Sequence, residues 1–455
     1  MIFHQAPPNG VLFYLCKSYL QYGFKTNVMF FRRCLCITIL FIFSYSLTAQ
    51  RIIIYCGKLI DTKSLQVLSE MTIIVEGKTI SDIQKGYIIP ATNDQVIDLK
   101  NRTVMPGLID CHVHLEEQTS SDQVREFRQN IADIAFESTV YAKTTLMAGF
   151  TTVRDVGGVG VNISLRNAIR KGIVVGPRMY AAGKIISSTG GHGDPTVGYR
   201  KDLMGDPGPL DGVANGKDEC IKAVRERYKE GADLIKITAS GGVLSLEKDG
   251  SGPQFSEEEI RVIVETAKDY GMKVAAHAHG AEAIKRAILA GVASIEHGTF
   301  MDDEDISLFK KYDVWFVPTI IAGKSVSDSA MKPGYFPPLI AQKATAIGPR
   351  IQATFSKAYK AGVKIAFGTD AGVYAHGKNW MEMQYMNEAG MPPLEVLRSA
   401  TWSASELIGI SDRAGSIEKG KWADIVAVEG DPIKDLQVMG KMKFVMKEGV
   451  VYRNE

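Results

Sequence analysis

Short apolar segments rich in β-branched residues lie near both ends of the chain, and a long region of different character separates them. These segments are residues 51–55, 71–75, 79–83, 423–428 and 444–452. Their length and the turn residues between them are typical of short β-strands. We therefore predict a small β-sandwich domain built from both chain ends, with residues 50–104 as its first part and residues 401–455 as a helix and its second part.

The middle of the chain alternates short apolar runs with helical patterns. Ser256 and Glu259 form a capping-box pattern that opens a predicted helix over 256–270, and a second helix is predicted over 281–290. The apolar runs are 104–109, 151–156, 179–186, 234–238, 273–276, 293–295, 315–318 and 364–367. Eight such units predict an α/β fold, a (β/α)8 TIM barrel over residues 105–400. A doubly wound sheet is the alternative, but no Gly-rich phosphate fingerprint follows the first strand.

The first 49 residues have a different composition and contain no Asp or Glu. From residue 29 onward, Arg32 and Arg33 precede an apolar run, and small residues follow it, which is the order of a secretory signal peptide. We predict a signal peptide over 29–49, and we interpret residues 1–28 as a misassigned upstream extension. The predicted location is exported, periplasmic or secreted. An uncleaved membrane anchor is the alternative; a cleaved signal leaves no stable membrane span.

Overall composition is that of a folded globular protein, with 45% hydrophobic and 23% charged residues, so disorder is excluded. The 53 Lys and Arg nearly balance the 51 Asp and Glu, which gives a net charge of +2 and argues against a nucleic-acid partner. Without residues 1–49 the net charge becomes −2 and three cysteines remain, Cys56, Cys111 and Cys220. That number cannot form a disulfide framework.

Histidines are concentrated where the predicted barrel strands end. Five of the eight follow such strands: His112, His114, His277, His279 and His297. Barrel active sites lie at the C-terminal ends of the strands, and Asp370 follows the eighth predicted strand. An isolated His-x-His pair is about as often a core or surface pair, but several imidazoles and one carboxylate at one end of a barrel predict a metal site. Such donors suit zinc, and manganese, iron or cobalt also fit.

Lys236 lies in the apolar strand 234–238, which ends beside these predicted ligands. One interpretation is a lysine that is ion-paired or extends its ammonium towards solvent. An ammonium beside metal ions would, however, repel them and lose its hydration. A carbamate on this lysine would instead be an anionic oxygen ligand able to bridge two ions.

With these residues in view, the sequence resembles the amidohydrolase superfamily. It resembles most the imidazolonepropionase-like branch that contains metal-dependent Xaa-Pro dipeptidases (prolidases). The resemblance covers nearly all of residues 51–455. Its motifs are residues 105–115, 151–158 (TTVRDVGG), 190–194 (GGHGD), 234–242 (LIKITASGG), 276–280 (AHAHG), 295–299 (IEHGT), 368–372 (GTDAG) and 415–424 (GSIEKGKWAD).

The resemblance implies two divalent metal ions, with zinc expected. His112, His114 and Asp370 would hold one ion, and His277 and His297 would hold the other. An N6-carboxylysine at Lys236 would bridge them together with a hydroxide. Imidazolonepropionases are mononuclear and lack this lysine, so Lys236 favours the dipeptidase side of the branch.

The resemblance also implies roles in catalysis and substrate binding. Asp370 would take a proton from the attacking hydroxide and pass it to the leaving amine, although a purely structural ligand is the alternative. Many branch members carry Tyr where this chain has His279, which we interpret as a donor that polarises the scissile carbonyl. His192 could bind the substrate carbonyl or carboxylate, or lie in a solvent-exposed loop. Tyr199 and Arg200 are candidates for a substrate carboxylate, and surface positions are equally compatible with them.

The predicted function is therefore hydrolysis of an amide or peptide bond in a small molecule or dipeptide, foremost release of a C-terminal residue such as proline. Hydrolysis of another cyclic or N-acyl amide is the second hypothesis. A non-catalytic metal- or ligand-binding protein is the third. The sequence does not decide the oligomeric state, and a homo-oligomer is compatible with it.

Overall fold

The computed structural model describes residues 51–122 and 124–455. The predicted signal peptide over 29–49 and the predicted extension over 1–28 lie outside these residues. In the part of the chain that is described, no helix combines the length and the apolar character needed to cross a membrane.

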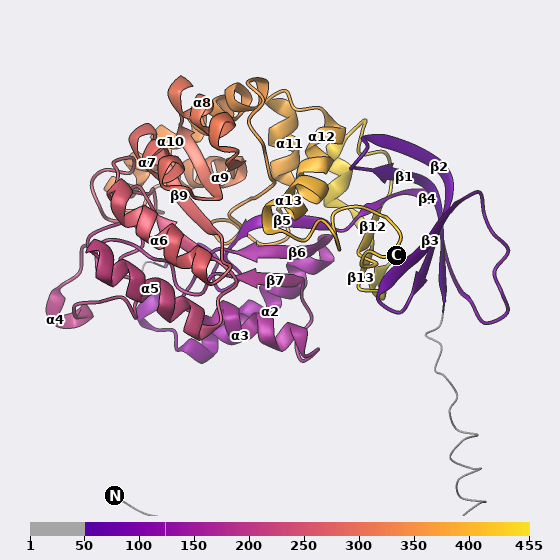
Figure 1. The fold of residues 1–455 in the computed structure, drawn as a ribbon, viewed down its shortest axis with the longest axis horizontal. Coiled ribbons are helices and arrows are strands. Elements are labelled where there is room, and N and C mark those ends of the chain that lie inside the picture. The colour runs from indigo at the N-terminus through magenta and orange to yellow at the C-terminus, as the bar shows by residue number, and fades with distance from the viewer. Residues whose placement is uncertain (1–50, 123) are drawn as a thin grey trace, which may run out of the picture. The chain divides into compact units, whose positions relative to one another are not determined.

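Both ends of the described chain join one mixed sheet of seven strands, in the order β14-β13-β12-β4-β1-β2-β3. Its strands are β1 (Ile52–Asp61), β2 (Gln66–Glu76), β3 (Thr79–Lys85), β4 (Gln95–Pro106), β12 (Ile425–Val428), β13 (Met442–Lys447) and β14 (Val450–Asn454). In Figure 1 the indigo strands from the start of the chain lie beside the yellow strands from its end, and β4 joins the two groups by pairing with β1 and β12. The predicted union of the two ends in one β unit is thus present.

The predicted β-sandwich is here a single hydrogen-bonded sheet. One apolar cluster contains buried residues from β1 to β4 and from β12 and β13, including Ile54, Ile73, Leu99 and Phe444. The β-branched segments predicted strands at both ends of the chain but not how they pair. β4 pairs parallel with β1 and antiparallel with β12, and the second pairing places strands from both ends in the same sheet.

The middle of the chain carries parallel strands in two ladders, β5-β6-β7 and β8-β9-β10-β11. Their bounds are β5 (Leu108–Val113), β6 (Phe150–Asp155), β7 (Arg178–Ala181), β8 (Ile235–Thr238), β9 (Val274–Gly280), β10 (Ser294–Phe300) and β11 (Trp315–Val317). Parallel bridges extend the ladders: Ile186 pairs with Ile237, Phe316 with Ile365, and Val113 with Ala371. The fold is α/β, and these connections are consistent with the predicted (β/α)8 barrel.

The first predicted barrel strand needs a correction. Residues 104–106 belong to β4 of the seven-stranded sheet, and the barrel strand β5 begins only at Leu108. Gly107 separates the two strands, and a Cβ at this position would lie 2.2 Å from Thr151 Oγ1. β5 also ends later than predicted, at Val113 instead of residue 109, so His112 lies within the strand.

Helices follow the parallel strands and cover them from outside (Figure 1). They are α2 (Ile131–Met147), α3 (Val161–Arg170), α4 (Lys201–Met204), α5 (Gly216–Glu230), α6 (Glu257–Asp269), α7 (Ala281–Ala290), α8 (Asp303–Tyr312), α9 (Ile320–Ala330), α10 (Pro338–Lys360), α11 (Met381–Glu388), α12 (Pro393–Arg398) and α13 (Ala404–Ile408). Shorter helical segments are η1 (Arg125–Phe127), η2 (Ser399–Ser403) and η3 (Leu436–Gly440). The predicted capping box of Ser256 and Glu259 opens α6, which confirms that helix.

Candidate metal centre

His112 lies near the end of β5, and His114 directly follows the end of the strand at Val113; residues two apart along an extended chain point to the same side. Both side chains are buried. His112 Nε2 lies 3.4 Å from Asp370 Oδ1, and His114 Nε2 lies 3.2 Å from the same oxygen. All three residues can thus present ligand atoms within 4.8 Å of one another. The structure brings together the three residues expected to hold one ion.

His277 and His279 come from β9 and His297 comes from β10, so the second group of imidazoles lies on neighbouring strands. The His277 and His297 ring centres are 4.5 Å apart, and those of His279 and His297 are 5.0 Å apart. His297 also lies 5.0 Å from His112, which connects the two groups. The five predicted barrel histidines therefore form one buried cluster.

Each of the four proposed ligand histidines has one ring nitrogen hydrogen-bonded to the protein. These bonds join His112 Nδ1 to Glu296 Oε2 at 2.8 Å, His114 Nδ1 to Gly157 O at 2.7 Å, His277 Nε2 to Gly241 O at 3.1 Å, and His297 Nδ1 to Thr319 Oγ1 at 2.7 Å. The other nitrogen of each ring makes no such bond to a carbonyl or hydroxyl of the described residues. Metal-binding histidines have this arrangement, because the outer hydrogen bond fixes the ring and leaves the second nitrogen for the ion.

Two of the proposed ligands have a left-handed backbone that L-residues rarely adopt: φ is 73° at His297 and 61° at Asp370. Such a conformation costs about 1–3 kcal/mol for a residue other than Gly. It also breaks the alternation of side chains along a strand. Glu296 and His297 are consecutive, yet Glu296 bonds to His112 and the His297 ring lies against the same imidazole.

Lys236 extends from β8 into this cluster, as the sequence predicted. Its Nζ lies 3.5 Å from His112 Nε2, and its side chain is buried. Burial lowers the pKa of Lys236 to about 8. A buried amine that loses its proton more readily is better able to react with carbon dioxide than an exposed lysine.

The imidazoles of the second group are held neutral. Burial, together with neighbouring imidazoles, places the pKa of His277 and of His297 well below the usual value. Burial also lowers the pKa of His279 to about 3. Burial opposes the charge of Asp370, but His112 and His114 hold its pKa well below the usual range. Neutral imidazole and ionised carboxylate are the forms that bind metal ions.

His192 lies beside this cluster, in the loop that follows β7. Its ring centre is 4.5 Å from that of His277, and its Nδ1 lies 2.5 Å from Ser245 Oγ. The side chain is 23% exposed, so it is not a freely solvated loop residue. Gly242 packs against the ring, because a Cβ there would lie 2.2 Å from His192 Cε1.

Comparison with known proteins places this geometry in a family. The model of the amidohydrolase family matches residues 103–452. The chain is 32% identical to an ochratoxinase from Aspergillus niger over 422 residues, which is 87% of this chain and 85% of the relative. The chain belongs to the amidohydrolase family.

Two solved structures are similar to this amidohydrolase over 89% of its chain and 100% of theirs. An Xaa-Pro dipeptidase with methionine bound in its active site has 50% sequence identity and a TM-score of 0.88. A prolidase complexed with N-methylphosphonate-L-proline has 30% identity and a TM-score of 0.82. Relatives with these names are hydrolytic enzymes, and so is this amidohydrolase.

The two residues predicted to anchor a substrate carboxylate lie on the surface of the amidohydrolase. Arg200 forms an ion pair with Asp202 at 2.5 Å, and its side chain is 74% exposed. Tyr199 is exposed and packs edge-to-face against Phe127, with ring centres 5.3 Å apart. The structure thus does not place Arg200 in the histidine cluster, and Tyr199 contacts an aromatic ring from another loop.

The residues that hydrogen-bond to the histidine rings and hold them in place were not predicted from the sequence. Glu296 and Arg154 lie in the motifs IEHGT and TTVRDVGG, but nothing local distinguished them from other charged residues. Thr299 Oγ1 lies 2.8 Å from His279 Nδ1, and Thr319 Oγ1 lies 2.7 Å from His297 Nδ1. The only indication in the sequence was that Glu296 lies next to the predicted ligand His297 within the motif IEHGT.

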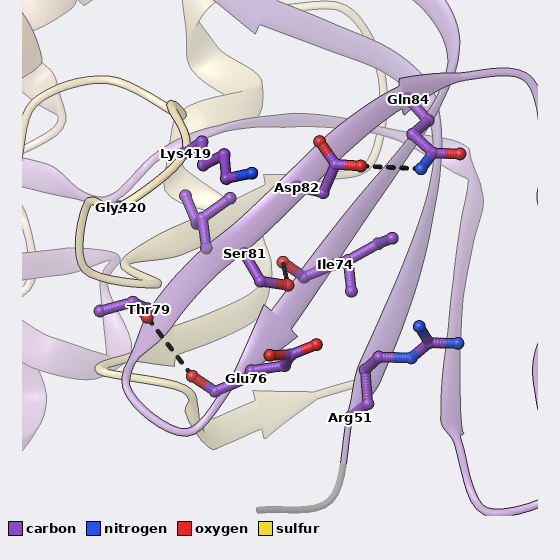
Figure 2. Close-up of a pocket in the computed structure, with 10 residues that line it drawn as sticks. Arg51, Ile74, Glu76, Thr79, Ser81, Asp82, Gln84, Lys419 and Gly420 are labelled. Carbon is purple, nitrogen blue, oxygen red and sulfur yellow. Dashed lines mark hydrogen bonds between the residues drawn. The ribbon is translucent and has the colours of Figure 1, made fainter.

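A polar cavity of about 540 Å³ lies elsewhere, on the seven-stranded sheet of the amidohydrolase (Figure 2). Asp82 accepts a hydrogen bond from Gln84 there, and Ser81 Oγ donates to Ile74 O. The described residues that line the cavity include the carboxylates of Glu76 and Asp82 but no His or Cys, so the cavity lacks the imidazole donors of the candidate metal centre.

Proposed function

We propose that this amidohydrolase is a metal-dependent dipeptidase that releases a C-terminal residue, with Xaa-Pro dipeptides as its foremost substrates. One observation carries the proposal: four buried imidazoles, each with one nitrogen bonded to the protein, surround Asp370 and Lys236. This donor set fits two divalent ions, with zinc expected. His112, His114 and Asp370 would hold one ion, His277 and His297 the other, and carboxylated Lys236 would bridge them.

When bound, the ions supply a water made acidic enough to act at neutral pH and an electrophile for the carbonyl. Residues of the chain itself would accept and donate the protons. Asp370 Oδ1 faces both His112 and His114 and is the carboxylate placed to accept a proton from water and return it to the leaving nitrogen.

His279 is proposed to polarise the scissile carbonyl. Thr299 Oγ1 lies 2.8 Å from His279 Nδ1. When this hydroxyl donates to Nδ1, the ring carries its proton on Nε2 and offers it to a substrate oxygen. The low pKa of His279 keeps the ring neutral, so it donates a hydrogen bond without adding positive charge beside the ions.

The sequence suggested that His192 binds a carbonyl or carboxylate of the substrate. The hydrogen bonds of its ring favour a different kind of substrate atom. Ser245 Oγ donates to Glu247 Oε1 at 2.7 Å and therefore accepts from His192 Nδ1. The neutral ring then offers Nε2 as an acceptor. Burial lowers the pKa of His192 to about 4, so a second proton is disfavoured. We propose that His192 binds an N–H of the substrate.

The substrate class rests on similarity. The Xaa-Pro dipeptidase with 50% identity and the prolidase complexed with a proline phosphonate favour dipeptides. The Aspergillus niger ochratoxinase favours the second candidate, hydrolysis of another cyclic or N-acyl amide. The (β/α)8 barrel and export by a signal over 29–49 belong to the same proposal.

A substrate panel tests these alternatives. Purified full-length protein reconstituted with zinc would be given a dipeptide library and a set of N-acyl amino acids, and released amino acids would be measured. Turnover of Xaa-Pro dipeptides supports the dipeptidase. Turnover of the N-acyl compounds alone transfers the assignment to the second candidate, and stoichiometric metal with no turnover of either set would favour a binding protein.

A further inference from the structure

Glu296 differs from the other groups that support the proposed ligand histidines. Its Oε2 lies 2.8 Å from His112 Nδ1, and its side chain is completely buried. The corresponding nitrogens of His114 and His277 bond to main-chain carbonyls, and that of His297 bonds to a hydroxyl. Among the four proposed ligand histidines, His112 is thus the one whose ring nitrogen facing away from the proposed ion is hydrogen-bonded to a carboxylate.

Arg154 holds this carboxylate in place. Its Nη2 donates to Glu296 Oε1 at 2.8 Å, and its Nη1 donates to Ser294 Oγ at 3.0 Å. Ser294 Oγ donates in turn to Glu296 Oε1 at 2.5 Å. One oxygen of Glu296 therefore faces Arg154 and Ser294, and the other is left for the imidazole.

Arg154 also fixes the strand that carries the ligand. Its Nε donates to the carbonyl oxygen of Cys111 at 2.6 Å, one residue before His112. A single side chain from β6 thus ties the main chain of β5 to the carboxylate of β10. This bond gives the buried Nε–H group a partner and at the same time holds the main chain directly before His112.

We propose that Arg154 and Glu296 are positioning residues that orient His112 for its metal ion; this rests on the proposed metal centre. Glu296 accepts the Nδ1 proton, so His112 presents Nε2, the atom nearest Asp370 and Lys236. A carboxylate partner also makes the imidazole a stronger donor to the ion. The His112 side of the centre should therefore bind its ion more tightly than it would with a neutral partner.

The test measures metal affinity without any substrate. Glu296→Gln keeps the shape and removes the charge, and titration of the metal-free protein against a chromophoric zinc chelator should show one ion bound about 10–100-fold more weakly. The absorption spectrum of the cobalt(II) protein should change as well. Asp424→Asn is the matched control, because Asp424 is also a buried carboxylate paired with an arginine, Arg178, at 2.6 Å, but it bonds to no imidazole in the described part of the chain. It should alter the melting temperature at most.

Two results would overturn the proposal: wild-type zinc affinity and cobalt spectrum in Glu296→Gln, or an equal loss of affinity in Asp424→Asn. If Glu296→Gln does not fold, Arg154→Lys decides, because it keeps the charge but loses the planar group that bonds to both Cys111 and Glu296. Weaker zinc binding in a folded Arg154→Lys supports the proposal, and unchanged binding contradicts it. A failed dipeptidase assay leaves these affinities interpretable, whereas wild-type protein that binds no metal would refute the proposed function itself.

Discussion

Ser245 Oγ lies 2.5 Å from Nδ1 of His192, across a gap of 53 residues in the sequence. The loop that carries Ser245 is itself held by Lys343 of α10, whose ammonium donates to the carbonyl oxygens of Gly242, Ser245 and Glu247 at 2.7–2.9 Å. The orientation of His192 beside the candidate metal centre therefore depends on a loop from the next β/α unit and on a helix much later in the chain.

Removing the Ser245 hydroxyl should release the His192 ring. We expect Ser245→Ala to lower kcat/KM roughly five-fold, since one neutral hydrogen bond contributes about 1 kcal/mol. Ser251→Ala is a matched control in the same loop, because the Ser251 hydroxyl bonds to Asp249. Steady-state kinetics on the best dipeptide substrate provide the measurement. An equal effect of both substitutions would show that general loosening of the loop, rather than the bond to His192, is responsible.

Gly242 offers a steric test of the same position. A Cβ at Gly242 would lie 2.2–2.4 Å from three ring atoms of His192, so Gly242→Ala must move the imidazole. Displacement of a positioned group by about 1 Å can cost on the order of 100-fold in rate. We expect a loss of kcat/KM of that order while zinc content stays at the wild-type level. Gly208→Ala is the control, because its Cβ would meet no atom within 4 Å. Full activity in Gly242→Ala would exclude a role for the His192 ring in its observed position.

Much of the candidate metal centre could be predicted because its signals are local. His112 in β5 and His114 directly after it are two residues apart, and Ser256 and Glu259 cap a helix within four residues, so short-range geometry predicts both features. The spacing of the parallel strands then brings their C-terminal ends together, and this predicted that Asp370 would lie with His112 and His114.

The supporting residues could not be predicted in this way. Glu296 is 184 residues from His112 and 142 from Arg154, and Lys343 is 98 residues from Ser245. Nothing in the sequence indicates that a particular glutamate or lysine has a buried partner far along the chain, because the same residue types usually cover solvated surfaces. Arg200 is the reverse case: the sequence left a substrate carboxylate and a surface position equally open, and the side chain bonds to Asp202, two residues away.

Lys236 leads to a prediction about pH and carbon dioxide. Carbamate formation requires the neutral amine, whose fraction rises with pH, and burial lowers the pKa of Lys236 from its ordinary value to about 8. Metal uptake by the metal-free protein should therefore become faster from pH 6 to pH 9 and should accelerate when bicarbonate is added. Zinc uptake can be followed with a chromophoric chelator at each pH. Lys236→Met should take up less zinc and show no response to bicarbonate; a wild-type rate that is independent of bicarbonate would argue against the carbamate.

Asp370 is expected to act on protons as well as on the metal. Asp370→Asn keeps the shape and one oxygen donor but cannot accept a proton, so kcat should fall by about 100-fold to 10,000-fold while part of the zinc is retained. Asp305→Asn is a suitable control, because Asp305 is also a buried carboxylate but caps α8 together with Asp302, away from the histidines. Kinetics and zinc content would be measured on the same preparations. Substantial activity in Asp370→Asn would reduce Asp370 to a structural ligand, and complete loss of zinc would mean that ligation alone explains the lost activity.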